Sequence, residues 1–292
     1  MSTNQQRREA AKRKLERQIV RRAERAKKRR AVGVVSTVVG VVLVVGLIYW
    51  LTTIGDDDTT TDPAAQTDTS QPEAAPDVPE SIPTELAAVP KRTKALADPV
   101  KCAYPKEEGR EPAKAVDPPA ADGVSSKGTV AATIALGSGE VKATLDRALA
   151  PCAVNSFVSL AKQNYFNDTV CHRLTTSGIQ VLQCGDPTGT GSGGPGYTFD
   201  DEVFPEIKYG RGILAMANAG KSPEGKGTNG SQFFIVYGTA ELPPNYTVFG
   251  SIDAESLKVV DEIAKKGTVS QGSPGDGKPV DEVKITGVTV AG

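Results

Sequence analysis

The sequence has very little with which to bind a metal ion. His172 is the only histidine in 292 residues, and no two of the four cysteines are separated by two residues. Zinc sites in proteins are usually built from several histidine or cysteine ligands at short spacings. A histidine-rich or C-x-x-C centre is therefore excluded, and we expect no metal site.

Charged residues are absent from residues 31–54, whereas residues 1–30 hold thirteen Lys or Arg and three Glu. A helix needs about 20 apolar residues to cross a bilayer, so this run is long enough. Tyr49 and Trp50 near its far end are typical of a membrane interface. Because positive flanks stay in the cytoplasm, the pattern predicts a single-pass helix in the cell membrane. Its N-terminus would be cytoplasmic and the rest of the chain extracytoplasmic.

Two other interpretations of the N-terminal region are weaker. A cleaved signal peptide has an apolar stretch of about 7 to 15 residues followed by a small-residue cleavage site. This run is longer, and no such site follows Ile54. Nucleic-acid binding by residues 1–30 is unnecessary, because attraction to anionic lipid and control of topology account for their charge. We expect a membrane partner and no nucleic-acid partner.

Large apolar residues are scarce between residues 55 and 100, where Asp, Thr, Pro, Ala and Gln dominate. Such a composition cannot bury enough surface to offset the entropy of ordering the chain. Residues 55–126 are therefore predicted to be an extracytoplasmic linker, disordered up to about Val100. Cys102 and Tyr104 predict that its last part docks on the folded domain, which we expect over residues 127–292.

Residues 127–292 contain many short apolar runs but only two helical patterns. Strand-like segments occur at 129–136, 140–145, 213–217, 232–237, 247–249 and 283–290. Helical spacing follows Pro151 and recurs over 255–266. Short antiparallel strands at this spacing are typical of barrels. The sequence predicts a mainly β fold, a closed eight-stranded antiparallel barrel capped by two α-helices.

The glycine-rich run 189–196 contains the pattern G-x-G-x-x-G at Gly189, Gly191 and Gly194. A dinucleotide site requires a helix to begin at such a pattern. Pro195 and Gly196 prevent that helix, so the nucleotide interpretation is rejected. The run is instead predicted to be a loop that approaches a ligand or a neighbouring backbone closely.

All four cysteines follow the predicted membrane span. If that side is oxidising, an even number of cysteines indicates two disulfides, for which three pairings exist. Cys171 and Cys184 bracket a hairpin symmetrically, which favours pairing them and leaves Cys102 to pair with Cys152. Free buried thiols remain the alternative.

The hairpin at residues 171–186 carries a candidate peptide-binding surface. Two short strands flank a Thr-Thr-Ser-Gly turn, and Arg173 and Gln183 can face the same side because strand side chains alternate. A guanidinium and an amide on one surface can bind a peptide backbone. A solvated hairpin with ordinary polar residues is the alternative explanation.

Five motifs in a fixed order give the sequence a family resemblance. They are His172-Arg173, QCGD at 183–186, GILAMANA at 212–219, NGSQFFI at 229–235 and VFG at 248–250. With them, residues 127–292 resemble the cyclophilins, a family of peptidyl-prolyl cis-trans isomerases. The anchored form resembles an actinobacterial membrane isomerase. The resemblance implies action on Xaa-Pro bonds of polypeptides without a cofactor.

The resemblance also implies site residues. Arg173 corresponds to the family's catalytic arginine. The residues expected to hold the substrate backbone are Gln183, Ala217, Asn218 and Gln232. Those expected around the proline ring are Val181, Phe234 and Leu242, with Tyr246 where the family usually has a histidine.

Three departures from the family bear on function. The hairpin turn is about two residues longer than usual, and Gln180 or Ile179 stands where a pocket phenylalanine is expected. Glu241 replaces a tryptophan that helps to bind cyclosporin, so weak cyclosporin binding is expected. We expect a monomeric isomerase domain that assists the folding of secreted or envelope proteins. The alternative, favoured by Gln180, is a catalytically weak module that binds proline-containing peptides.

Overall fold

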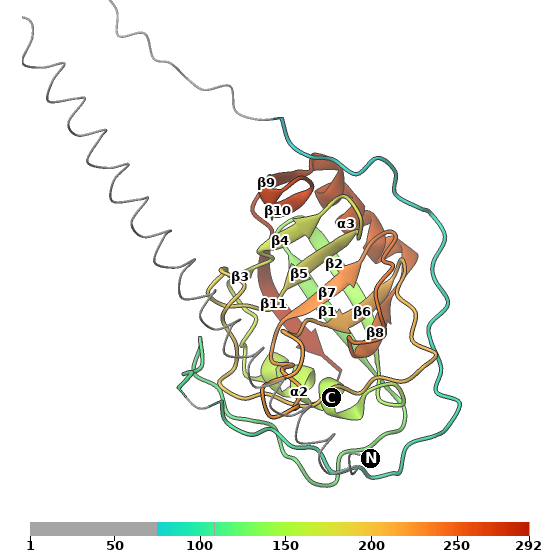
Figure 1. The fold of residues 1–292 in the computed structure, drawn as a ribbon, viewed down its shortest axis with the longest axis vertical. Helices are drawn as coiled ribbons and strands as arrows, with labels where there is room; N and C mark the ends of the chain where they lie inside the picture. The colour runs from blue at the N-terminus through green and yellow to red at the C-terminus, as the bar shows by residue number, and fades with distance from the viewer. Residues whose placement is uncertain (1–74, 108, 292) are drawn as a thin grey trace, which may run out of the picture. The chain divides into compact units, whose positions relative to one another are not determined.

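The computed structural model describes residues 75–107 and 109–291, and the predicted segments 1–30 and 31–54 lie outside them. Within this part, no helix has the length and apolar character needed to cross a bilayer. It contains one eleven-stranded sheet and two α-helices (Figure 1). The elements are β1 (Thr129–Leu136), β2 (Gly139–Asp146), α2 (Pro151–Lys162), β3 (Thr169–Val170), β4 (Arg173–Thr175), β5 (Val181–Cys184), β6 (Ile213–Met216), β7 (Phe233–Val236), β8 (Val248–Ile252), α3 (Ala254–Lys266), β9 (Thr268–Ser273), β10 (Asp276–Pro279) and β11 (Lys284–Val290).

The first hairpin gives the sheet its apolar inner face. β1 and β2 pair without a break from Thr129 opposite Asp146 to Leu136 opposite Gly139. Every second residue of β1 is buried, as strand alternation predicted. The buried residues are Val130, Ala132, Ile134 and Leu136.

Hydrogen-bonded neighbours in the sheet follow the order β3-β11-β1-β2-β8-β6-β7-β5-β4-β10-β9, which does not close on itself. The mainly β class with two helices is confirmed, but the prediction of a closed barrel with eight strands is wrong. Three of the strands carry no strong apolar pattern. β3 has two residues, β9 exposes five of its six, and β10 contains glycine and proline. These three strands form because their backbones pair with neighbouring strands. Such pairing cannot be predicted from the pattern of apolar residues.

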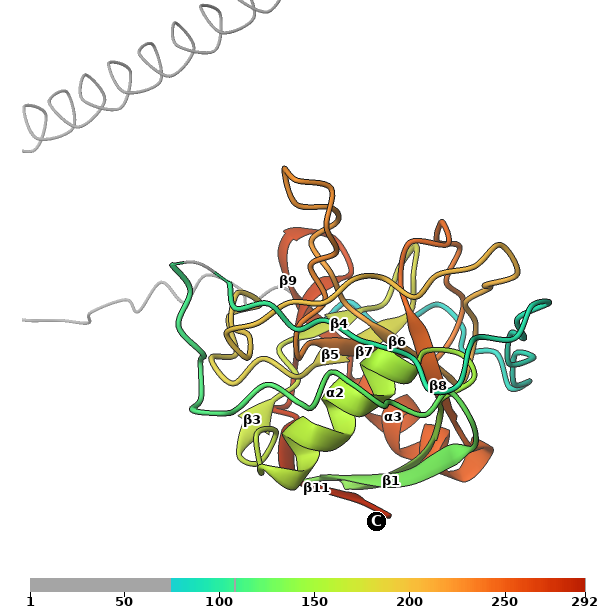
Figure 2. The ribbon, with the colours of Figure 1, turned by 90° about the horizontal axis from the view of Figure 1, so that it is seen from below.

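The two helices lie at separate ends of the sheet (Figures 1 and 2). α2 contacts β11, β2 and β8, whereas α3 contacts β2 and β10. Pro151 occupies the first turn of α2, as predicted, and Asp253 caps α3 by accepting a backbone N–H. Phe157 on α2 packs into the core, where its ring centroid lies 5.0 Å from that of Phe166 and 5.5 Å from that of Phe233.

Residues 75–126 lie against the sheet domain. Asp77 exchanges two backbone hydrogen bonds of 3.0 and 2.9 Å with Thr268. The Arg92 guanidinium donates to the carbonyl of Leu149 and lies 4.4 Å from the ring centroid of Phe204. The prediction of a disordered spacer up to Val100 is therefore wrong from Asp77 onward. Main-chain hydrogen bonds, Arg92 and a few widely spaced apolar residues such as Ile82 and Ala87 hold this segment, and so sparse a set leaves no apolar pattern in the sequence.

Both predicted disulfides are confirmed. Cys102 is bonded to Cys152 in the first turn of α2, and Cys171 is bonded to Cys184 at the end of β5. The first bridge closes a segment with a sequence separation of 50, and the second closes the hairpin with a separation of 13. We call residues 99–107 and 109–126, which the first bridge fastens to the domain, the strap.

A carboxylate occupies the N-terminus of α2 beside this bridge. Glu202 accepts the backbone N–H groups of Cys152 at 3.0 Å and Ala153 at 2.8 Å. The helix dipole and these N–H groups favour a negative charge there. Burial opposes that charge more strongly and raises the pKa of Glu202 to about 7, although the two N–H groups and Arg92 act in the other direction.

The raised pKa of Glu202 predicts a pH-dependent stability. The folded protein holds this proton more tightly than the unfolded chain does, so the free energy of unfolding should fall as pH rises from about 4.5 to 7. We expect the wild type to lose about 3 kcal/mol over this window relative to Glu202→Gln, which has no such proton. Urea unfolding of both proteins at pH 4.5, 6 and 7.5 measures the difference. Parallel pH profiles would contradict the prediction.

Candidate active site

Arg173 and Gln183 face each other across the hairpin, as alternation predicted. β4 and β5 pair Arg173 directly with Gln183. The Arg173 Nη1 group donates to Gln183 Oε1 at 3.1 Å. The guanidinium is thereby held on the same face of the sheet as the amide.

Asp276 fixes the orientation of Arg173 from the other side. Its two carboxylate oxygens accept from Nε and Nη2 of Arg173, each at 2.7 Å. This hydrogen-bonded pair lowers the pKa of Asp276 and raises the pKa of Arg173, so both groups stay charged. Such a bidentate contact fixes the plane of a guanidinium as well as its position. The sequence analysis missed Asp276, because it stands alone in a glycine-rich turn 103 residues from its partner.

The hydrogen-bonded chain continues from Gln183 to the glycine-rich loop. Gln183 Nε2 donates to Gln232 Oε1 at 2.9 Å, and Gln232 Nε2 donates to the carbonyls of Gly191 and Gly193 at 2.9 and 3.0 Å. Both predicted glutamines are thus joined in one network with Arg173. Their amide orientations are set before a substrate arrives.

Asp186 holds the glycine-rich loop in place. Its carboxylate accepts the N–H groups of Thr188, Gly191 and Gly193. Burial raises the pKa of Asp186, but these N–H groups outweigh burial and lower it. A Cβ atom at Gly193 would collide with the carboxylate, so the loop needs glycine there. The loop was predicted to approach a ligand or a neighbouring backbone closely, whereas the group that Gly193 approaches is the side chain of Asp186.

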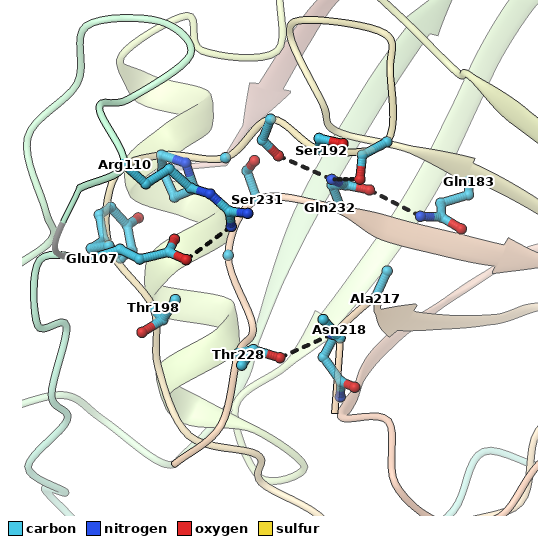
Figure 3. Close-up of a pocket in the computed structure, with 17 residues that line it drawn as sticks. Glu107, Arg110, Gln183, Ser192, Thr198, Ala217, Asn218, Thr228, Ser231 and Gln232 are labelled. Carbon is cyan, nitrogen blue, oxygen red and sulfur yellow. Dashed lines mark hydrogen bonds and ion pairs between the residues drawn. The ribbon is translucent and has the colours of Figure 1, made fainter. Parts of the chain in front are cut away.

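A cavity of about 250 Å³ opens beside this network (Figure 3). It is lined by all four residues predicted to hold a substrate backbone, namely Gln183, Ala217, Asn218 and Gln232. The Asn218 amide donates to Asp201 and to the carbonyl of Asn245, each at 3.0 Å. The structure therefore brings these predicted residues together around one space.

Aromatic side chains lie beside Gln183. Phe234 on β7 pairs with Gln183 in the sheet register and lies 5.6 Å from Tyr246 between ring centroids. Tyr209, which the sequence analysis missed, lies 6.5 Å from Phe234, and its hydroxyl contacts the backbone N–H and carbonyl of Tyr246. Val181 is buried on β5, and Leu242 is half-buried in the connection from β7 to β8.

Gln180 does not take part in this arrangement. Its side chain is buried, donates to the carbonyl of Ser81 at 2.6 Å and accepts the backbone N–H of Thr239 at 2.8 Å. The Gln180 side chain is thus bonded to the segment before the sheet domain and to the residue after β7. Its predicted contact with substrate finds no support in this geometry, and the argument that it weakens a proline pocket loses its basis.

A second cavity of about 550 Å³ is lined by Arg173 and Gln183, together with His172, Asp276 and Lys278. Burial lowers the pKa of His172, which keeps its ring neutral at pH 7. In the described part of the chain, neither ring nitrogen has a hydrogen-bond partner. The cations that border this space at neutral pH are therefore Arg173 and Lys278.

Replacing Asp276 by Asn tests its role in positioning Arg173. The variant keeps the size of the side chain but loses the charge that holds two N–H groups. We expect kcat to fall about tenfold with little change in KM, because a charged hydrogen bond is worth about 1.5–3 kcal/mol. Because the pKa of Asp276 is lowered, the wild type should keep its activity from pH 8 down to pH 5. Wild-type kcat in D276N would contradict the role.

Comparison with known proteins adds an independent line of argument. The family model for cyclophilin-type peptidyl-prolyl cis-trans isomerases matches residues 131–290. Probable peptidyl-prolyl cis-trans isomerase B of Mycobacterium leprae is 48% identical over 200 residues, which cover 64% of this chain and 65% of that protein. Its Mycobacterium tuberculosis counterpart is also 48% identical, over 54% of each chain. The chain thus spans 54–65% of the length of these relatives.

Shorter relatives are covered almost completely. Peptidyl-prolyl cis-trans isomerase A of Mycobacterium tuberculosis is 42% identical over 56% of this chain and 93% of its own length. A Cryptosporidium parvum isomerase structure of the cyclophilin type is 34% identical, covers 56% of this chain and 99% of that chain, and has a TM-score of 0.46. The family match and the near-complete coverage of isomerase A, together with the joined arginine and glutamines, establish the relationship. The chain belongs to the cyclophilin-type peptidyl-prolyl cis-trans isomerase family.

Proposed function

We propose that this protein catalyses cis-trans isomerisation of Xaa-Pro bonds in polypeptides. The observation that carries the proposal is the Arg173 guanidinium, held by Asp276 and Gln183 on a surface next to an aromatic cluster. A guanidinium has five N–H groups, and the described residues occupy three of them. Two therefore remain for a peptide, and 38% of the side chain is exposed.

The chemistry follows from amide resonance. Rotation about the peptide bond has a barrier of about 18–20 kcal/mol because the twisted bond loses its double-bond character. Twisting localises a lone pair on the proline nitrogen. A fixed cation that donates to this nitrogen binds the twisted state more strongly than either planar state, and such differential binding lowers the barrier.

The remaining residues are assigned to holding the peptide. Gln183, Gln232 and Asn218 offer amide groups to its backbone, while Phe234 and Tyr246 offer an apolar seat for the proline ring. With the ring seated, rotation is confined to the residue on the other side of the bond. No covalent intermediate is needed, because no bond is broken.

A protease-coupled assay on a Xaa-Pro peptide tests this function. Uncatalysed isomerisation takes about 10–100 s at 25 °C, so a catalyst at micromolar concentration should visibly shorten the slow phase. We expect the rate constant to rise linearly with protein concentration. A slow phase unchanged at every concentration would contradict the proposal.

The setting of the activity is also a proposal, supported by residues 1–54 of the sequence. We propose that the uncharged run 31–54 anchors the protein in the cell membrane and that the domain acts outside the cytoplasm on secreted or envelope proteins. The two disulfides support an oxidising compartment. Recovery of the full-length protein in the carbonate-soluble fraction would contradict the anchor.

Two properties of the isomerase domain complete the proposal. Glu241 at the position of the family's tryptophan should give weak cyclosporin binding, so half-inhibition at nanomolar cyclosporin would argue against it. The domain is proposed to be monomeric. Light scattering of residues 75–292 that gave twice the monomer mass would argue against that state.

A further inference from the structure

The strap reaches the candidate active site although it precedes the region that the family model matches, residues 131–290. Glu107 and Arg110 of the strap line the 250 Å³ cavity together with Gln183 and Gln232. We infer that the strap completes this cavity as a specificity site, which selects a side chain of the peptide close to the proline. The inference rests on the proposed function and adds a substrate preference to it.

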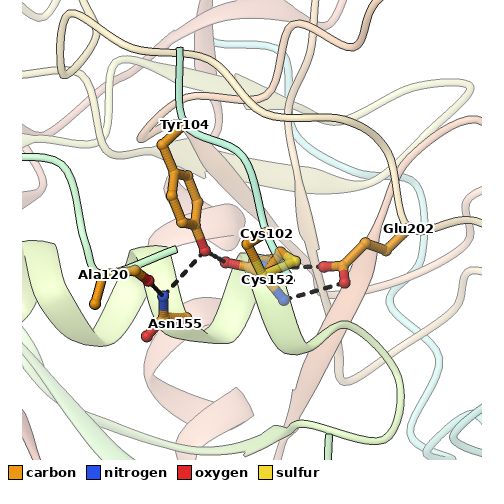
Figure 4. The surroundings of a disulfide bond; sticks show 7 residues. Cys102, Tyr104, Ala120, Cys152, Asn155 and Glu202 are labelled. Carbon is orange, nitrogen blue, oxygen red and sulfur yellow. Dashed lines mark hydrogen bonds between the residues drawn. A yellow bond between two sulfur atoms is a disulfide. The ribbon is translucent and has the colours of Figure 1, made fainter. Parts of the chain in front are cut away.

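The strap is anchored at its start by a disulfide and a hydrogen-bonded tyrosine (Figure 4). Besides the Cys102–Cys152 bridge, the buried Tyr104 hydroxyl donates to the carbonyl of Cys152 at 2.8 Å. It also accepts from Asn155 Nδ2 at 3.1 Å, and the same amide group donates to the carbonyl of Ala120 at 2.8 Å. The strap is thus bonded to α2 near its start, at Cys102 and Tyr104, and near its end, at Ala120.

The strap then pairs with the glycine-rich loop that borders the cavity. Thr198 donates its N–H to the carbonyl of Pro105, and Glu107 donates its N–H to the carbonyl of Gly196. Ala113 completes the contact by donating to the carbonyl of Gly194. The loop that accepts from Gln232 on one side therefore holds the strap on the other. This backbone pairing sets where Glu107 and Arg110 stand.

Glu107 and Arg110 are the two charged residues among those lining the cavity. Arg110 Nη1 lies 2.9 Å from Glu107 Oε1, and the arginine side chain is 54% exposed against 32% for the glutamate. Figure 3 shows the Arg110 guanidinium extending toward Ser231, with the Glu107 carboxylate beside it. The opposite wall consists of neutral amides and hydroxyls.

This arrangement favours a carboxylate in the cavity over an ammonium group. The Arg110 guanidinium is the more exposed of the two charges and faces the cavity. Only one of the five N–H groups of this guanidinium is bonded to Glu107. A peptide glutamate or aspartate near the proline would gain a charge-assisted hydrogen bond from Arg110. A lysine at the same place would meet the guanidinium first and be repelled.

Peptides that differ at single positions test the preference. Glu, Ala or Lys is placed in turn at each of the three residues before and two residues after the proline, and kcat/KM is measured with the full-length protein. At one position we expect Glu to exceed Lys about fivefold, which corresponds to about 1 kcal/mol for partly exposed charges. In Arg110→Ala the ratio should fall to one or below, because Glu107 is then the charged residue that remains in the cavity lining. In Arg110→Glu it should reverse.

Lys101→Ala is the matched control, because Lys101 is an exposed strap residue paired with Asp122 and does not line the cavity. It should keep the wild-type ratio. Calorimetric measurement of the affinity for the same peptides distinguishes the proposed isomerase activity from the proposed specificity site. If the wild type binds Glu peptides more tightly than Lys peptides but isomerises neither, the proposed function fails and the specificity site stands. Equal Glu-to-Lys ratios in wild type and Arg110→Ala would overturn the specificity site alone.

Discussion

Arg173→Ala is expected to lower kcat/KM on a Xaa-Pro peptide by about 100- to 1000-fold. Removing one fixed donor from a site that stabilises developing charge typically has this effect. Here the donor is fixed on two sides, since Asp276 holds Nε and Nη2 while Gln183 holds Nη1. No other described cation is joined to the two glutamines, so the loss has no local substitute.

Two further arginine variants sharpen this prediction. Arg173→Lys keeps a positive charge but loses the planar fork, so we expect an intermediate loss of about 10- to 100-fold. Arg147→Ala removes a half-buried arginine whose guanidinium hydrogen-bonds only to the Thr129 carbonyl among the described residues, and it should keep wild-type activity. The protease-coupled assay measures all three. Equal rates for the wild type and Arg173→Ala would refute the assigned mechanism.

Loss of the Cys102–Cys152 bridge is expected to lower the free energy of unfolding by about 4 kcal/mol. The bridge closes a loop with a sequence separation of 50, and its removal frees the unfolded chain from that constraint. The same reasoning gives about 3 kcal/mol for Cys171–Cys184, whose separation is 13. The longer loop should therefore have the larger effect.

Paired serine substitutions measure each bridge by urea unfolding. The variants are Cys102→Ser with Cys152→Ser, and Cys171→Ser with Cys184→Ser. The first pair should also weaken the Glu-over-Lys preference, because the strap loses its covalent anchor. If the first pair left the unfolding transition unchanged, the strap would detach independently of the domain, and the predicted contribution to global stability would be wrong.

Several features of the site were readable from the sequence because they depend on neighbours along the chain. Alternation on two short strands places Arg173 opposite Gln183, and the symmetric position of Cys171 and Cys184 around the turn favours their pairing. The motif at 229–235 likewise places Phe234 on β7 and Gln232 directly before that strand. Side chains two residues apart on a strand share a face whatever the rest of the fold does.

Other features were not readable, and each involves a contact between distant segments. Asp276 lies 103 residues from Arg173, and Ser81 lies 99 residues from Gln180. The short strands β3, β9 and β10 exist because partner strands are present. The predicted closed barrel failed for the same reason, since closure depends on which strand edges meet.

The sequence by itself therefore indicated the mainly β class, the two helices, the favoured pairing of the cysteines and, through the family resemblance, four of the residues that line the cavity. The tertiary structure alone decided the open strand order of the sheet, the bidentate contact of Asp276 with Arg173 and the position of the strap beside the cavity. The physical reason is that periodicity and spacing report local geometry. Contacts such as Glu107 N–H with the Gly196 carbonyl are made by backbone groups, which every residue carries and no sequence pattern distinguishes.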